Sequence, residues 1–264
     1  MTKTHDDQLL SRRRVLGMVA KGAAAFTVMP ALSSCMGGSH TGPDASGDGG
    51  DSGTSACSRI PDETAGPFPG DGTNGQNALT LSGIVRSDIR SSIAGATGVA
   101  DGVLLTVTLT ILDASTCSPL ADRAVYVWQC DRQGNYSMYS TAVVDENYLR
   151  GVQVTDSAGQ VTFTTIFPGC YAGRWPHIHF EVYPSLASAT NGSNDIATSQ
   201  LALPKTACDA VYATSGYSTS ATNLSQVSLS SDNVFSDDAT LQLATITGSV
   251  SDGFVATLPV TVRV

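Results

Sequence analysis

The chain has 264 residues, of which 41% are hydrophobic and 14% charged, and its formal net charge is −9 at pH 7. The basic residues after residue 35 are few and scattered, so we expect no nucleic-acid partner, which would need a cationic surface to neutralise its phosphates. No two cysteines have the close spacing of a zinc finger, which disfavours a structural zinc site.

Residues 1–35 are predicted to be an export signal. The run SRRRVL at residues 11–16 is a twin-arginine pattern, and the apolar stretch after it is too short for a stable membrane span. The run LSSC at residues 32–35 resembles a lipobox, which predicts that Cys35 becomes the lipidated first residue of a membrane-anchored lipoprotein facing the periplasm or the exterior. The alternative is a plain export signal in which Cys35 occurs by chance.

Residues 36–56 consist mostly of Gly, Ser, Asp and Thr. Such a stretch buries too little apolar surface to offset the entropy of ordering it, so we predict a flexible tether. Residues 57–264 are long enough for one domain with a hydrophobic core. Once residues 1–35 are removed, 9 basic and 21 acidic side chains remain, a net charge of −12.

Six segments of this domain are predicted to be strands because they are rich in Val, Ile, Thr, Leu and aromatic residues. They lie at residues 78–85, 103–112, 124–129, 160–166, 177–183 and 254–264. Clusters of Gly, Asp, Ser and Pro separate them, and residues 203–214 have the character of a short helix. The pattern predicts an all-β fold, namely an antiparallel β-sandwich with long loops and few short helices.

Five cysteines follow Cys35, and in an oxidising compartment some of them should pair. Because five is an odd number, at least one is expected to be free or paired with another chain. No other feature of the sequence predicts an oligomeric state.

The domain contains two histidines, His177 and His179, on either side of Ile178 in an apolar predicted strand. Because side chains alternate along a strand, both imidazoles should point to the same face, where they would make a pair of neighbouring metal ligands. The alternative is two half-exposed histidines on a solvated face. Glu181 shares this face, and a carboxylate ligand would suggest the Fe(II) of a facial triad.

Tyr171 is a stronger candidate for a further ligand, because it follows a Pro-Gly turn that leads into the histidine strand. A bound trivalent ion would lower the pKa of the phenol enough to ionise it. Phenolate is a hard anionic donor, which favours Fe(III) over Fe(II). The alternative for any single tyrosine is a core or rim aromatic.

Five motifs, taken together, resemble the intradiol ring-cleavage dioxygenases, the family of catechol and protocatechuate dioxygenases. They are IPDETAGPF at residues 60–68, VYVWQCD with GNYS at residues 125–137, LRGVQVTD at residues 149–156, GQVTFTTIFPG at residues 159–169, and the spacing of Tyr171, Arg174 and the two histidines. The resemblance spans most of residues 57–264 and is closest to the exported, single-domain members.

The resemblance implies a non-haem Fe(III) centre held by Tyr136, Tyr171, His177 and His179, with no organic cofactor. It further implies that Arg174 and Gln200 act on the substrate beside Tyr171, which leaves the metal when the substrate binds. The expected activity inserts both atoms of O2 into a catechol-type aromatic and cleaves it between the two hydroxyl-bearing carbons, giving a muconate-type dicarboxylate, as in the catabolism of aromatic compounds.

Several points depart from the family pattern or stay open. Cys170 and Trp175 stand beside the expected ligands, where they could reshape the substrate pocket. The cysteines that flank family motifs suggest a Cys57–Cys130 disulfide first and Cys117–Cys208 second. Two other hypotheses compete with the dioxygenase: an exported non-catalytic β-sandwich that binds a glycan or protein and keeps a vestigial site, and a site of the same four residues that holds copper or zinc.

Overall fold

The computed structural model describes residues 57–264. The predicted export signal, the predicted lipidation of Cys35 and the predicted tether at residues 36–56 all lie outside the described residues. Within residues 57–264, no helix is both long enough and apolar enough to cross a membrane.

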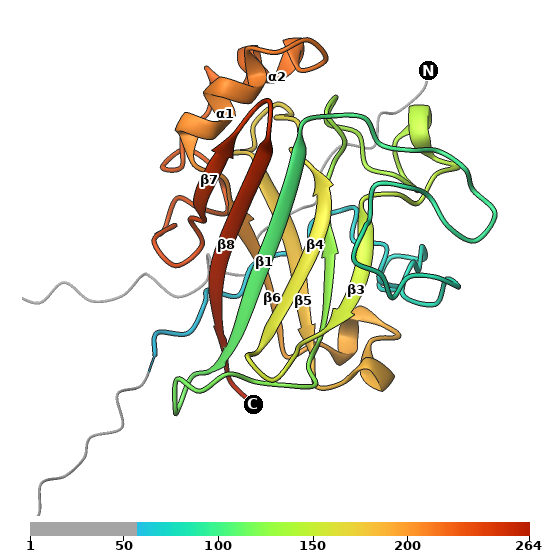
Figure 1. Ribbon diagram of the computed structural model, residues 1–264, viewed down its shortest axis with the longest axis vertical. Coiled ribbons are helices and arrows are strands. Elements are labelled where there is room, and N and C mark those ends of the chain that lie inside the picture. The colour runs from blue at the N-terminus through green and yellow to red at the C-terminus, as the bar shows by residue number, and fades with distance from the viewer. Residues whose placement is uncertain (1–56) are drawn as a thin grey trace, which may run out of the picture. The chain divides into compact units, whose positions relative to one another are not determined.

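Eight strands form two four-stranded sheets that pack face to face (Figure 1). The first sheet has the order β4-β1-β8-β7, with β1 at Leu104–Asp113, β4 at Gln160–Ile166, β7 at Thr245–Ser249 and β8 at Gly253–Val262. The second sheet has the order β3-β2-β5-β6, with β2 at Ala124–Trp128, β3 at Arg150–Val154, β5 at His177–Tyr183 and β6 at Ala197–Ala202. The prediction of an all-β sandwich is confirmed.

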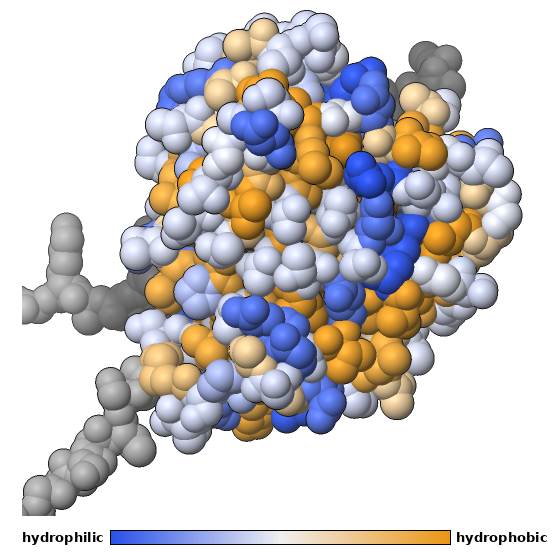
Figure 2. All heavy atoms as spheres, viewed as in Figure 1, coloured by the Kyte–Doolittle hydropathy of each residue, from blue (hydrophilic) through white to orange (hydrophobic). Residues whose placement is uncertain are grey.

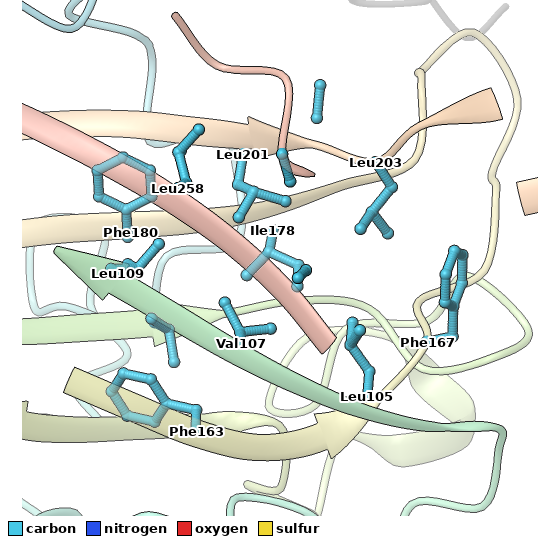
Figure 3. Packing of buried hydrophobic residues seen from close by; sticks show 14 of the residues in the cluster. Leu105, Val107, Leu109, Phe163, Phe167, Ile178, Phe180, Leu201, Leu203 and Leu258 are labelled. Carbon is cyan, nitrogen blue, oxygen red and sulfur yellow. The ribbon is translucent and has the colours of Figure 1, made fainter. Parts of the chain in front are cut away.

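The main hydrophobic core fills the space between the two sheets. Leu105, Val107 and Leu109 of β1 alternate with partly exposed residues and face Ile178 and Phe180 of β5 (Figure 3). Removing each such side chain from water stabilises the fold by about 1.5–3 kcal/mol. Figure 2 shows pale spheres of intermediate hydropathy across much of the opposite face of the first sheet, where β1 presents its threonines.

The outer face of the second sheet is buried as well, under loops that cross it. All seven residues of β5 are buried, because Ile178 and Phe180 lie in the main core and the alternate residues lie under these loops. Ala78, Leu79 and Ile84 of the covering loops pack in one apolar cluster with Tyr126 and Trp128 of β2. This second cluster forms the surroundings of the candidate site.

Three details of the sandwich differ from the prediction. Strands β1 and β8 pair in parallel, although all other ladders are antiparallel. Residues 78–85 form turns rather than a strand. Their apolar residues cover the second sheet and pair with it only in a bridge between Val85 and Val152 of β3, and Gly83 has a φ of +89°. The short strands β3, β6 and β7 were not among the six predicted strands.

The helices are short. Helix α1 at Lys205–Tyr212 lies inside the predicted helical region, whereas α2 at Ser218–Leu224 was not predicted. Both lie at the same end of the sandwich (Figure 1). Three single 3-10 turns complete the helical structure of the described residues, at Thr141–Val143, Leu186–Ser188 and Gly192–Asn194.

Both predicted disulfides are wrong, because Cys57 pairs with Cys117 at a Cα–Cα distance of 5.4 Å. The first described residues run beside the end of β8, where the Ile60 N–H donates to the Thr261 carbonyl, and Cys117 lies in the turn that follows the neighbouring β1. The bond closes a loop of 60 residues. By lowering the entropy of the unfolded chain, it raises the free energy of unfolding by roughly 4 kcal/mol. The other described cysteines, Cys130, Cys170 and Cys208, are free and buried.

Candidate metal centre

Four side-chain donor atoms converge on the outer face of the second sheet. His177 and His179 come from β5, Tyr136 from the loop after β2, and Tyr171 from the segment between β4 and β5. The His177 Nε2 atom lies 3.1 Å from His179 Nε2, 3.1 Å from the Tyr171 hydroxyl and 3.4 Å from the Tyr136 hydroxyl. The two hydroxyl oxygens are 3.4 Å apart.

The two imidazoles are held so that their Nε2 atoms face each other. The His177 Nδ1 atom lies 2.5 Å from the Trp175 carbonyl and donates to it, so Nε2 carries the lone pair. The indole of Trp128, directly opposite on β2, stacks on the His179 ring at 4.8 Å and 9°. Burial lowers the pKa of His177 to about 3 and that of His179 well below its ordinary value. Both are therefore neutral at pH 7, the form in which histidine binds a metal.

The two phenols are buried to different degrees. Tyr136 is 2% exposed and its ring packs on Phe68, whereas Tyr171 is only half-buried. Burial raises the pKa of Tyr171 to about 12 and that of Tyr136 well above its ordinary value. Both are protonated in the absence of a cation, and a nearby multivalent cation is the influence that would ionise them.

The donor set fits a metal cation. The two Nε2 atoms lie within hydrogen-bond distance of each other, and the His179 Nδ1 atom has no hydrogen-bond partner in the described structure, so no contact there opposes the tautomer whose Nε2 lone pair would bind a metal. A cation among the four donor atoms would satisfy both nitrogens and both ionised oxygens at once. Within residues 57–264, no three His, Cys, Asp or Glu side chains cluster closely enough to hold a metal, so a two-histidine, one-carboxylate triad does not form.

Glu181 is directed to a different network. Its carboxyl group accepts a hydrogen bond from the Tyr183 hydroxyl at 2.5 Å, and burial raises its pKa to about 9. The same face of β5 therefore carries two distinct polar groups, one around the histidines and one around Glu181.

Arg174 and Gln200 contact each other beside the four donors. The Arg174 Nη2 atom donates to Gln200 Oε1 at 2.6 Å, and Gln200 Nε2 donates to the Thr64 carbonyl at 2.9 Å. Gln200 is fully buried on β6, opposite His179 of β5 in the ladder. All six residues singled out from the sequence thus lie in one region, and their assigned roles stay predictions.

Two further residues of this region were not found from the sequence. Asp232, which is fully buried, forms an ion pair with the Nε atom of Arg174 at 2.9 Å. Arg150 is also fully buried, and it donates to the carbonyls of Phe68, Pro69 and Ser137. Arg150 thereby ties the loop at residues 60–70 to the loop that carries Tyr136.

Cys170 and Trp175 do not line the site. Both are buried in the main core between the sheets, and the Trp175 indole N–H donates to the Leu203 carbonyl at 2.9 Å. Cys170 and Trp175 therefore support the segment that carries Tyr171 and Arg174. They would affect the shape of the pocket only through that segment.

Comparisons with known proteins identify dioxygenases that this chain resembles. A family model described as Dioxygenase matches residues 88–188. No curated protein matches the chain. An intradiol ring-cleavage dioxygenase from Tetranychus urticae is 26% identical, with a TM-score of 0.62, over 78% of this chain and 95% of that one.

Two other solved structures are more distant. The dioxygenase domain of a dioxygenase carbohydrate-binding protein fusion from Streptomyces sp. SirexAA-E is 23% identical with a TM-score of 0.49, over 78% of this chain and 99% of that one. Catechol 1,2-dioxygenase from Pseudomonas arvilla C-1 is 17% identical with a TM-score of 0.44, over 71% of this chain and 60% of that one.

Proposed function

We propose that this chain, which is similar to the intradiol ring-cleavage dioxygenases, opens a catechol-type ring with O2 at a ferric site. The ligands would be Tyr136, Tyr171, His177 and His179. Both oxygen atoms enter the product, a muconate-type dicarboxylate, after cleavage between the two hydroxyl-bearing carbons. The observation that carries the proposal is the convergence of two phenol oxygens and two imidazole nitrogens on the outer face of one sheet.

The chemistry of the donors supports iron in its ferric state. Two phenolates and two neutral imidazoles supply a charge of −2, which suits a trivalent ion better than a divalent one. When bound, the ferric ion supplies Lewis acidity and a template for the substrate oxygens. Metal analysis of the purified protein would distinguish iron from copper or zinc in the same site.

Tyr171 is the ligand best placed to make room for the substrate. It is half-buried, whereas the other three proposed ligands are fully buried. Its phenolate oxygen would accept a proton from a catechol hydroxyl as the substrate takes its place, which is general-base catalysis. Tyr136, which is buried, and His179, which is stacked on Trp128, would stay in position during this exchange.

Arg174 and Gln200 would act on the substrate ring. The guanidinium is always charged and would stabilise the negative charge that develops on the ring. Gln200 has its carbonyl oxygen on Arg174 and its amide nitrogen on the Thr64 carbonyl, so it is oriented at both ends. The two residues would contact the part of the substrate ring that faces away from the metal ligands, and so would fix the orientation of the ring.

The decisive experiment combines colour and product analysis. Protein expressed with iron should be red-brown, with a broad visible band that shifts when catechol is added without oxygen. Oxygen uptake over a panel of catechols, followed by mass analysis with ¹⁸O2, should show both labelled atoms in a ring-opened dicarboxylate. A colourless protein that stays free of iron, or a product with fewer than two labelled atoms, would contradict the proposal.

We also propose that this enzyme works outside the cytoplasm, exported by a twin-arginine route and anchored to the membrane by a lipid on Cys35. The runs at residues 11–16 and 32–35 support this proposal. Fractionation of cells that express the full chain tests it. Cys35→Ala should move the protein from the membrane to the soluble fraction, and an unchanged distribution would contradict the lipid anchor.

A further inference from the structure

We propose that Asp232 is a positioning residue, whose carboxylate holds the Arg174 guanidinium in place beside the four donor atoms. This inference rests on the proposed function, since Asp232 would act on the reaction only through Arg174. Asp232 lies 58 residues after Arg174 in the chain, in the segment between α2 and β7.

One carboxylate oxygen of Asp232 binds two successive residues. Its Oδ2 atom accepts the Arg174 Nε–H at 2.9 Å and the Trp175 backbone N–H at 2.6 Å. The Asp232 side chain is fully buried and the Arg174 side chain is 14% exposed, so little water competes for this pair. The carboxylate thus fixes both the guanidinium and the backbone from which it extends, two residues before His177.

Asp232 is itself held rigidly. Its other oxygen, Oδ1, accepts the backbone N–H groups of Val234 at 2.8 Å and Phe235 at 3.2 Å, which closes an Asx-type turn. The Phe235 ring carried by that turn lies 6.0 Å from the Arg174 guanidinium carbon and 6.4 Å from the His177 ring. The turn therefore presents a carboxylate and an aromatic ring together to Arg174.

The contacts restrict Arg174 at two separate nitrogens. Nε is bound by Asp232 and Nη2 by Gln200, whose own amide nitrogen is bound by the Thr64 carbonyl. Because the guanidinium is planar and rigid, two fixed nitrogens define the orientation of the whole group. Stabilisation of charge in a transition state depends on such fixed orientation more than on the presence of the charge alone.

A double-mutant cycle tests this role. The four proteins are the wild type, Asp232→Asn, Arg174→Gln and the double variant, all expressed as the full chain and loaded with iron. We expect Asp232→Asn to lower kcat for catechol about tenfold or more. In the Arg174→Gln background the same change should alter kcat by less than about twofold, because nothing is left to position.

Three controls separate positioning from folding. Asp232→Ser keeps a hydroxyl that can accept from Val234 and Phe235 but removes Oδ2, so it carries the test if Asp232→Asn fails to fold. Asp238→Asn changes an exposed carboxylate of the same segment and should keep wild-type kcat. Catechol affinity, measured without oxygen from the shift of the visible band, should change far less than kcat in Asp232→Asn.

Metal-free protein provides a readout that does not depend on activity. Thermal unfolding of the four iron-free proteins should show coupling between Asp232 and Arg174, because either single variant leaves one buried charge unpaired and the double variant does not. An equal fall in kcat in both backgrounds, or wild-type kcat in Asp232→Asn, would overturn the inference. A wild type that cleaves no catechol would overturn the proposed function and this inference with it, whereas failure of the inference alone leaves the wild type active.

Discussion

The Nε2 atoms of His177 and His179 face each other at 3.1 Å, so a cation beside them could bind both nitrogens in place of the hydrogen bond that they share. Alternation along β5 puts both rings on one face, and the Trp175 carbonyl and the Trp128 indole set their orientations. The pair is therefore prepared by the fold before any metal binds.

This arrangement predicts that iron stabilises the protein. At a free metal concentration one hundred times Kd, binding should add about 2.7 kcal/mol to the free energy of unfolding. Denaturation of the iron-loaded protein and of the same protein stripped by a chelator measures the difference. His177→Gln and His179→Gln should abolish it, and His40→Gln, in the predicted tether, should keep it. Equal stability with and without iron would contradict the site.

Tyr171 and Tyr139 provide a matched pair of tyrosines near the site. Tyr171→Phe removes the proposed exchangeable ligand and base, so kcat/KM should fall about 100-fold or more and the visible band should change. Tyr139 instead accepts from the Gly70 N–H and donates to Asn74, so Tyr139→Phe should keep the band. Absorption spectra and oxygen uptake of both variants measure these effects, and the reverse result would assign the ligand to Tyr139.

Arg150→Lys should weaken the cover of the site. A lysine cannot reproduce the donors that Arg150 gives to Phe68, Pro69 and Ser137, so buried carbonyls lose partners and the free energy of unfolding should fall by roughly 2–4 kcal/mol. Iron content should fall too, because Ser137 adjoins Tyr136. Arg90→Lys, at an exposed pair with Asp88, should cost less than about 0.5 kcal/mol. Similar losses in the two variants would contradict this role.

The thiol of Cys208 should react slowly in the native protein. Burial raises its pKa well above the ordinary value, so the reactive thiolate is scarce at every pH from 7 to 9. Alkylation followed by peptide mapping should show far slower labelling in the native state than in denaturant at each pH. In denaturant the pKa returns to its ordinary value, so the rate should level off as the pH passes that value, whereas the slow native rate keeps rising. Native labelling as fast as labelling in denaturant would contradict the burial.

The sequence predicted the features that depend on local pattern. Strand β5 alternates clearly, and it carries both histidines of the domain, so their shared face could be predicted without any relative. Tyr136 could be chosen over Tyr139 only through the family resemblance, because the two lie three residues apart in one loop. The structure brings Tyr136 to the histidines and directs the Tyr139 hydroxyl to Gly70.

Long-range contacts could not be predicted in this way. Asp232 looks like an ordinary turn residue in the sequence, and its contact with Arg174 depends on how the segment after α2 folds back. The Cys57–Cys117 disulfide depends on the first described residues lying beside β8, a neighbour of β1. Residues 78–85 have the composition of a strand, but their apolar side chains cover the second sheet, and only Val85 pairs with it, in a bridge to Val152.

The donor cluster lies outside the main core, between the second sheet and the loops that cross it. Side chains that face inward from β1 and β5 form the main core, whereas the loops near residues 65–84 and 136–139 pack in the second cluster, around the site. Changes in these two sets of residues should therefore combine almost independently. Such a division would let substrate range diversify under selection while the sandwich that supports the metal stays intact.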